Sequence, residues 1–263
     1  MTFRLLKYEL RSSVILMAIV WAAMLLTSIM VTLFTESLMN SGSEFVQILG
    51  SIPIFLFGAA CVAMGVGMVF VIVIRFYKSL MGDEGYLMHT LPVKEWQLIT
   101  SKGLSATIYT IACAVVVFIS LIIFTKGDVI SGLIGALPEF LERPEFILYT
   151  LEAVMVAIFG ILKSVYQVYA SLAIGQLVDR HRILLAAGAY CGIGAVIAVL
   201  TSIFTVIGIN LDVNLVELFN PAEVAPFVAV QLLFIVVFLA ELAQVVIFHV
   251  VTERLLTQKL NLV

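Results

Sequence analysis

The sequence predicts an all-α polytopic membrane protein with six transmembrane helices. Of the 263 residues, 63% are apolar and only 12% are charged, whereas roughly 25% of the residues in soluble domains are charged. A soluble fold of this length could not bury so many apolar residues, because the ratio of surface to volume falls only slowly as a chain grows longer. Apolar runs such as Ala112–Ile123 do not alternate with polar residues as the strands of a membrane barrel do. The solvent for most of the chain is therefore lipid, and helices cross it.

Six apolar stretches are long enough to cross a bilayer. Because a helix rises about 1.5 Å per residue, roughly 20 apolar residues cross the hydrocarbon core, which is roughly 30 Å thick. Short polar segments separate the spans, which we place near Val14–Phe34, Ser51–Ile74, Leu104–Thr125, Ile147–Val178, Ile183–Gly208 and Val228–Val250. The fourth span is longer than a bilayer requires, so we expect it to tilt, to break or to extend beyond the membrane at Ala173–Arg182. Gly160 is a candidate for a bend in this span.

Residues 1–13 precede the first span and carry an amphipathic pattern. If they are helical, Arg4, Lys7 and Arg11 share one face, because they recur at steps of three and four residues. We expect an interfacial helix, with its basic face toward lipid phosphates and its apolar face in the acyl boundary. The alternative is a positive flank that only orients the first span. Residues 14–263 then form a single six-span domain.

The distribution of basic residues predicts the orientation, because Lys and Arg are enriched on the cytoplasmic side of membrane proteins. Only Lys126 and Arg143 fall on the other side, where the loops are mostly acidic. Both termini are therefore expected in the cytoplasm, in a multi-pass protein of the cell membrane. The net charge of −3 reflects the outer loops and indicates no nucleic-acid partner. The basic residues on the cytoplasmic side are Arg4, Lys7, Arg11, Arg75, Lys78, Lys94, Lys102, Arg180, Arg182, Arg254 and Lys259.

The longest inner segment, residues 75–102, has the pattern of a helix, a turn and a second helix. Gly82 and Gly85 bracket two acidic residues, as is typical of a turn. Pro92 suits the first turn of a helix, because proline lacks an N–H group that would be unpaired there. Beyond it, Trp96 and Ile99 share a face. We expect this segment to lie at the cytoplasmic surface.

Short motifs in this segment resemble those of a known family. Gly82-Asp-Glu-Gly-Tyr-Leu is followed by Thr90-Leu-Pro-Val and by Ser101-Lys102 just before the third span. Ala173-Ile-Gly-Gln-Leu and the closing Lys259-Leu-Asn-Leu add to the likeness. With six spans and both ends inside, the chain resembles the ABC type-2 (ABC-2) permeases, the exporter subunits of Gram-positive bacteria.

The resemblance implies a function and partners. In this family the first inner loop holds a coupling helix that docks into a separate ATPase subunit. Two such ATPase subunits, which bind ATP and Mg, would serve a pair of permease chains, a homodimer or a heterodimer, in the bacterial plasma membrane. The cargo would be an amphipathic or apolar drug, lipid or peptide that leaves the cytoplasm. The residues carried over to ATPase coupling are Asp83, Glu84, Gly85, Tyr86, Leu91, Pro92 and Val93, joined by Trp96 from the same loop.

The chain has no nucleotide-binding motif of its own. A phosphate-binding loop needs the pattern Gly-x-x-x-x-Gly-Lys-Ser/Thr, and no stretch fits it. The three cysteines and three histidines lack metal-ligand or disulfide spacing. We therefore expect a transport subunit rather than an enzyme, with no cofactor or metal on this chain and ATP hydrolysis on a partner. Two alternatives stay open: residues 75–102 only connect two spans, or the protein is a secondary transporter driven by an ion gradient.

Charged residues inside the spans are the remaining functional signal, because each costs at least roughly 2.5–3.5 kcal/mol there unless it is paired or hydrated. Glu152 and Lys163 lie in the fourth span, and Glu241 lies in the last. Lys163 and Glu241 fall at comparable depths, so we expect them to face each other or a polar cavity. Together with Gln167 and Gln244 they predict a polar stripe between these two spans. The stripe either lines a transport pathway or fixes helix packing.

Overall fold

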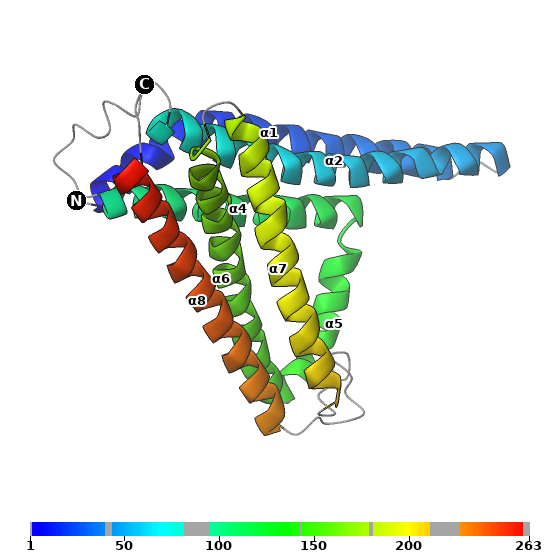
Figure 1. The fold of residues 1–263 in the computed structure, drawn as a ribbon. Helices are drawn as coiled ribbons and strands as arrows, with labels where there is room; N and C mark the ends of the chain where they lie inside the picture. Colours follow the sequence, from blue (N-terminus) through cyan, green and yellow to red (C-terminus); the bar gives the residue numbers. More distant parts are fainter. Residues whose placement is uncertain are drawn as a thin grey trace. The chain divides into compact units, whose positions relative to one another are not determined.

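The described chain of this computed structural model is helical nearly throughout. The structure describes residues 2–39, 44–81, 95–142, 144–178, 181–210 and 227–259. Within these ranges it contains no β-strand, which confirms the predicted all-α class (Figure 1). The elements in chain order are α1 (Thr2–Met39), α2 (Glu44–Phe76), the π-helix η1 (Tyr77–Met81), α4 (Glu95–Phe124), α5 (Asp128–Glu142), α6 (Pro144–Gly175), α7 (Arg182–Asn210) and α8 (Phe227–Lys259).

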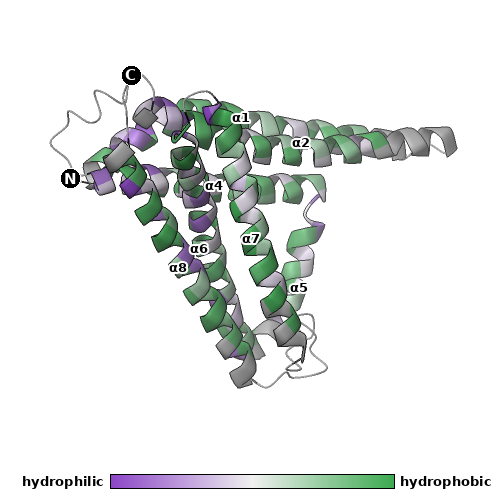
Figure 2. Cartoon of the chain, viewed as in Figure 1, coloured by the Kyte–Doolittle hydropathy of each residue, from purple (hydrophilic) through white to green (hydrophobic). Residues whose placement is uncertain are grey.

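Six of these helices are long and apolar enough to cross a membrane, as the sequence predicts. Figure 2 shows that hydrophobic residues dominate along them. Their outward faces are apolar as well, since Ile15, Phe55 and Phe70 are 75%, 79% and 61% exposed. Contiguous exposed apolar surface of this kind belongs in lipid rather than in water. The protein is therefore a multi-pass membrane protein, with candidate spans at Leu5–Thr35, Ile52–Ser79, Glu95–Phe124, Glu145–Gly175, Arg182–Ile203 and Leu233–Thr257.

The chain divides into two compact units. The first unit comprises Met1–Arg75 and Thr100–Arg143, and the second comprises Phe76–Ile99 and Pro144–Val263. The chain therefore passes between the units three times: near the end of α2, near the start of α4, and between α5 and α6. The segment that carries the predicted coupling residues belongs to the second unit.

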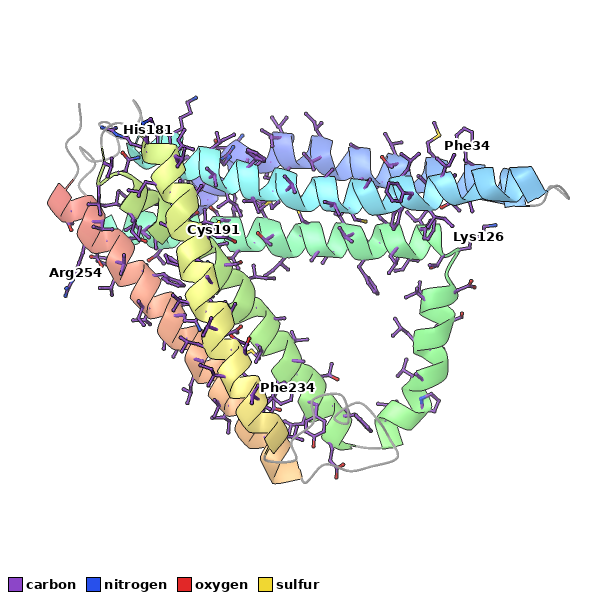
Figure 3. The ribbon with its side chains drawn as sticks, turned by 45° about the vertical axis from the view of Figure 1, so that its right-hand side comes forward. Phe34, Lys126, His181, Cys191, Phe234 and Arg254 are labelled. Carbon is purple, nitrogen blue, oxygen red and sulfur yellow. The ribbon has the colours of Figure 1, made fainter. Side chains whose placement is uncertain are left out.

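In the first unit, α1, α2 and α4 lie side by side (Figures 1 and 3). The buried residues of α1 include Met17, Met24 and Val31. Residues seven apart lie on one helix face, so this face of α1 packs into the interior of the unit. Polar contacts join the same helices within the apolar interior. The Trp21 indole N–H donates to Cys113 Sγ at 3.2 Å, and the hydroxyl of Ser28 in α1 donates to a backbone carbonyl oxygen of α4 at 2.9 Å.

The expected interfacial segment, residues 1–13, is helical from Thr2 onward and is not separate from the first span. Helix α1 runs without interruption from Thr2 to Met39, and no Gly or Pro lies near residue 13 to break it. Lys7 and Arg11 are exposed, whereas Ser13 on the opposite face is buried. The amphipathic pattern thus continues directly into a span.

A tight corner joins α4 to α5, a helix that the sequence reading did not anticipate. Lys126 and Gly127 have φ values of 53° and 89°. The N–H of Gly127 bonds to the carbonyl of Ile122 at 3.0 Å and that of Lys126 to the carbonyl of Ile123 at 3.2 Å, which is the Schellman pattern that ends a helix. The Gly127 carbonyl then accepts the Ser131 N–H at 2.9 Å. Gly127 therefore closes α4 and caps α5.

In the second unit, α6 packs against both α7 and α8. Helix α6 continues through Gly160 without a break and ends at Gly175. A Cβ atom at Gly175 would lie 2.6 Å from the Arg182 carbonyl oxygen and 2.7 Å from Ala186 Cβ. Only glycine allows this close approach of α6 and α7. The helical part of the fourth span therefore stops short of the predicted limit at Val178.

Candidate functional site

The polar groups between α6 and α8 form the candidate site. Lys163 Nζ lies 3.3 Å from Glu241 Oε1, and the two side chains are 22% and 13% exposed. Of the two expected arrangements, a facing pair or a polar cavity, the structure shows the facing pair. The separation exceeds the 2.7–2.9 Å that is usual for a charge-assisted hydrogen bond. The pair is therefore close enough to neutralise both charges without a tight hydrogen bond.

Gly160 explains how a carboxylate fits between the two helices. A Cβ atom added to Gly160 would lie 3.1 Å from Glu241 Oε1, which is tighter than an ordinary van der Waals contact. The missing side chain on α6 therefore leaves room for the Glu241 carboxylate. The sequence suggested a bend at this glycine, but its role in the structure is to accommodate an acidic group from α8.

Two acceptor atoms beside the ion pair have no hydrogen-bond partner among the described residues. They are Glu241 Oε2 and Gln244 Oε1, and both are buried. Residues three apart on a helix share one face, so both acceptors belong to the same stripe of α8. Chemically, the site carries a charged pair and unsatisfied acceptors, which suits a hydrogen-bond-donating or cationic group.

A second polar contact joins the same two helices. Gln231 Nε2 of α8 donates to Glu152 Oε2 of α6 at 3.2 Å. Glu152 lies eleven residues before Lys163, about three helical turns away, so it faces the same side of α6. The predicted stripe between the fourth and last spans therefore has two paired positions along the α6–α8 interface.

Gln167, the fifth residue of the predicted stripe, has a neighbour on a third helix. It is buried and lies toward α7, since a Cβ atom at Gly194 would be 3.7 Å from Gln167 Nε2. Gln167 is four residues after Lys163 and shares its helix face, and α6 has both α7 and α8 as neighbours. Contacts between α6 and α8 are thus shown for Glu152 and Lys163, while Gln167 is shown close to α7.

A chain of aromatic contacts lies next to this stripe, and the sequence reading did not identify it. Phe76 stacks on Tyr169, with ring centroids 3.9 Å apart. Tyr166 contacts Tyr169 edge to face at 6.0 Å and contacts His249 of α8 at 5.3 Å. Tyr166 is three residues from Lys163, so these rings connect the end of α2 with the α6–α8 interface. The spacing of the two tyrosines was visible in the sequence, but their partners were not.

Most of the predicted ATPase-coupling residues lie outside the described residues. These are Asp83, Glu84, Gly85, Tyr86, Leu91, Pro92 and Val93. Trp96 is described and is 41% exposed, whereas Leu98 and Ile99 after it are buried. Helix α4 continues from Glu95 to Phe124, so the second helix of the predicted hairpin is continuous with the third span.

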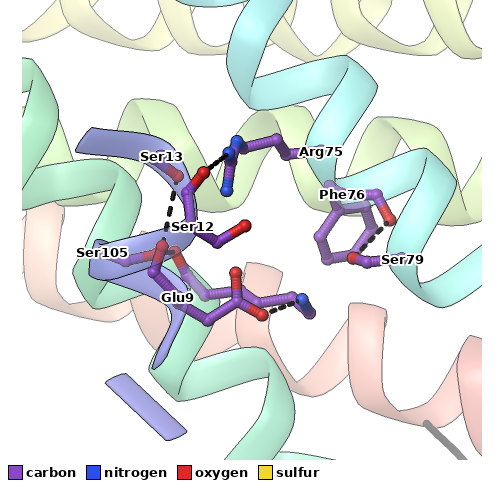
Figure 4. A network of polar contacts seen from close by, with 8 residues as sticks. Glu9, Ser12, Ser13, Arg75, Phe76, Ser79 and Ser105 are labelled. Carbon is purple, nitrogen blue, oxygen red and sulfur yellow. Dashed lines mark hydrogen bonds and ion pairs between the residues drawn. The ribbon is translucent and has the colours of Figure 1, made fainter. Parts of the chain in front are cut away.

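Three helices of the first unit meet in a second polar cluster (Figure 4). Lys102 of α4 is only 5% exposed and forms an ion pair with Glu9 of α1. Arg75 of α2 donates to the Ser12 carbonyl oxygen at 2.7 Å, and the Tyr109 hydroxyl donates to the Leu10 carbonyl oxygen. The sequence placed Lys102 on the cytoplasmic side, and the structure buries its side chain with a counter-ion. The side chain of the predicted surface residue Arg4 lies outside the described set.

The described ranges hold no group of three His, Cys, Asp or Glu residues that could bind a metal ion. Comparison of the chain with protein-family models, with curated proteins and with solved structures gave no match in any of the three.

Proposed function

We propose that this chain is the transmembrane permease subunit of an ATP-driven ABC exporter. The observation that carries a transport role is the polar α6–α8 interface, with its Lys163–Glu241 pair at 3.3 Å and two unsatisfied acceptors. Ionisable groups within spans are costly, and they commonly line substrate or ion pathways. The cargo is an amphipathic or apolar molecule that leaves the cytoplasm, such as a drug, a lipid or a peptide.

The proposed energy source rests on the sequence. The chain lacks a phosphate-binding loop, and Gly82–Val93 resembles the coupling segment of ABC-2 permeases. In this proposal two ATPase subunits hold ATP and Mg, and two permease chains pair in a bacterial plasma membrane with both termini in the cytoplasm. ATP binding would shift the paired chains between inward- and outward-facing states.

The aromatic contacts supply a physical route for such coupling within the second unit. Phe76 precedes the proposed coupling segment and is 1% exposed, stacked on Tyr169. Leu98 and Ile99, which follow that segment, are also buried. A force on the coupling segment would therefore act on packed side chains next to Lys163 rather than on a free loop. Packed interiors transmit displacement because they have few voids.

Site-specific photocrosslinking tests the proposed coupling. A photoreactive amino acid is introduced at Trp96 or at Tyr86, and at Phe55 as the control, because Phe55 is 79% exposed on a candidate span. We expect the first two positions to capture a protein with ATPase activity and Phe55 to capture lipid. If Trp96 and Tyr86 also captured lipid alone, the proposed coupling would be refuted.

The ion pair also suits a second candidate function, a secondary transporter driven by an ion gradient. Intramembrane ionisable groups occur in such proteins as well. Purification separates the two candidates: a stoichiometric ATPase should accompany the detergent-extracted exporter. Transport that survives ATP depletion but stops when the ion gradient is dissipated would favour the secondary transporter.

A further inference from the structure

Helix α5 has an apolar stripe that no other described part of the first unit covers. Its large apolar side chains Ile130, Leu133, Ile134, Leu137 and Leu141 are 40%, 54%, 59%, 45% and 61% exposed. At 100° per residue they fall within an arc of about 100° on the helix surface. Asp128, Gly132 and Gly135 lie on the opposite face, and no atom lies within 4 Å of a Cβ built on either glycine. The helix is therefore strongly amphipathic and uncovered on both faces.

The position of α5 relates it to the end of a membrane span. Helix α4 ends at Phe124 and α5 begins at Asp128, so the corner at Lys126 keeps the start of α5 within a few ångströms of the α4 terminus. Figure 3 shows α5 turning away at Lys126 and running across the common direction of α1, α2 and α4. A helix that runs across the spans at their end lies along the membrane surface.

The length of α5 is consistent with this placement. Fifteen residues make a helix of about 22 Å, too short to cross a hydrocarbon core of roughly 30 Å. The corner fixes this arrangement through hydrogen bonds at both helix ends, including the Ser131 N–H to the Gly127 carbonyl at 2.9 Å. The helix is thus tethered at the interface, which leaves its apolar stripe to be covered by its surroundings.

We propose that α5 is an interfacial helix whose apolar stripe is buried in the acyl boundary of the adjacent leaflet. The partner is a lipid surface, recognised by its hydrocarbon rather than by its charge. Interfacial helices that depend on anionic lipid are rich in Lys and Arg. Residues 126–145 instead carry the carboxylates Asp128, Glu139, Glu142 and Glu145 against only Lys126 and Arg143. Anionic headgroups are therefore not expected to strengthen the contact. This inference goes beyond the proposed function and does not depend on the energy source.

Spin-label accessibility in lipid nanodiscs tests the proposal. Single cysteines are introduced into a background in which Cys61, Cys113 and Cys191 are replaced, and each is labelled with a nitroxide. The matched pair is Leu137→Cys on the stripe and Gly135→Cys on the opposite face. Ile119→Cys, on the exposed face of the α4 span, is the lipid standard. Electron paramagnetic resonance then compares collision with O2, which concentrates in lipid, and with a water-soluble nickel chelate.

The accessibility ratio should differ between the two faces of α5. The O2-to-nickel ratio at Leu137→Cys should approach that at Ile119→Cys and exceed that at Gly135→Cys about fivefold, as for a helix half immersed in a leaflet. Replacement of zwitterionic by anionic lipid should leave the ratio unchanged. Equal nickel accessibility at both α5 positions would overturn the proposal, as would low accessibility to both reagents at Leu137→Cys, which indicates cover by protein. A contact that appears only with anionic lipid would overturn its apolar basis. None of these outcomes depends on whether an ATPase is captured at Trp96.

Discussion

Removing one partner of the Lys163–Glu241 pair should cost more stability when the other partner is present than when it has already been removed. Two unit charges 3.3 Å apart attract by about 5 kcal/mol at an effective dielectric constant of 20. Much of this offsets desolvation, and polar pairs in membrane proteins couple by only about 0.6–1.7 kcal/mol. Both side chains keep some exposure, so we expect a coupling energy of about 1–2 kcal/mol between these residues.

The two single substitutions should not be equivalent. Lys163→Met removes the cation that pairs with Glu241. The Glu241 side chain is short, and its Oε2 atom already has no hydrogen-bond donor. Glu241→Gln leaves a lysine, whose long side chain can move its ammonium group toward water. We therefore expect Lys163→Met to lower the free energy of unfolding by about 2–3 kcal/mol. Glu241→Gln should lower it by about 1 kcal/mol less than Lys163→Met does. The double variant should be more stable than the sum of the two single effects predicts.

The assay is the unfolding free energy in bicelles, measured by steric trapping for the wild type, both single variants and the double variant. A coupling energy near zero would refute the view that these groups form an energetically significant pair. The charge swap Lys163→Glu with Glu241→Lys then separates structure from transport. Recovery of both stability and transport in the swap indicates a packing role, whereas recovered stability with persistent loss of transport indicates a pathway role.

Two further predictions concern packing and a buried charge. Gly175→Ala should destabilise the protein by about 1–3 kcal/mol, because the new Cβ would meet Ala186 Cβ at 2.7 Å. The matched control is Gly58→Ala, where no atom lies within 4 Å of the added Cβ. The control should be tolerated in the same thermal unfolding measurement. Lys102→Met should lower the melting temperature more than Lys102→Met combined with Glu9→Gln, since the single variant leaves a carboxylate unpaired; equal melting temperatures would contradict the pairing.

Composition and length were sufficient to predict the spans, because the cost of polar groups in lipid leaves few alternatives to long apolar helices. The same cost made the Lys163–Glu241 pairing predictable, since two isolated charges at similar depths each need a partner. The pattern could not show which neighbour each face of α6 contacts. The proximity of Gln167 to Gly194 of α7 therefore could not be read from the sequence.

Local sequence rules also missed the continuity of helices. Residues 1–13 were expected at the membrane surface and residues 75–102 at the cytoplasmic surface, yet the helix from Thr2 and the helix from Glu95 each continue without a break into a span. The charges are accommodated by contacts distant in the sequence, such as that between Glu9 and Lys102. No local pattern reports a partner more than ninety residues away.

The sequence by itself determined the class of this protein, the number of its spans and the charges that lipid would force into contact. The tertiary structure decided which helix faces meet, that Gly160 makes room for a carboxylate, and that α5 runs across the end of the first unit. The physical reason is that a helix with apolar residues on all sides can turn any face toward lipid at little cost. Hydrophobicity places such a helix in the membrane, and only packing against its neighbours sets its rotation.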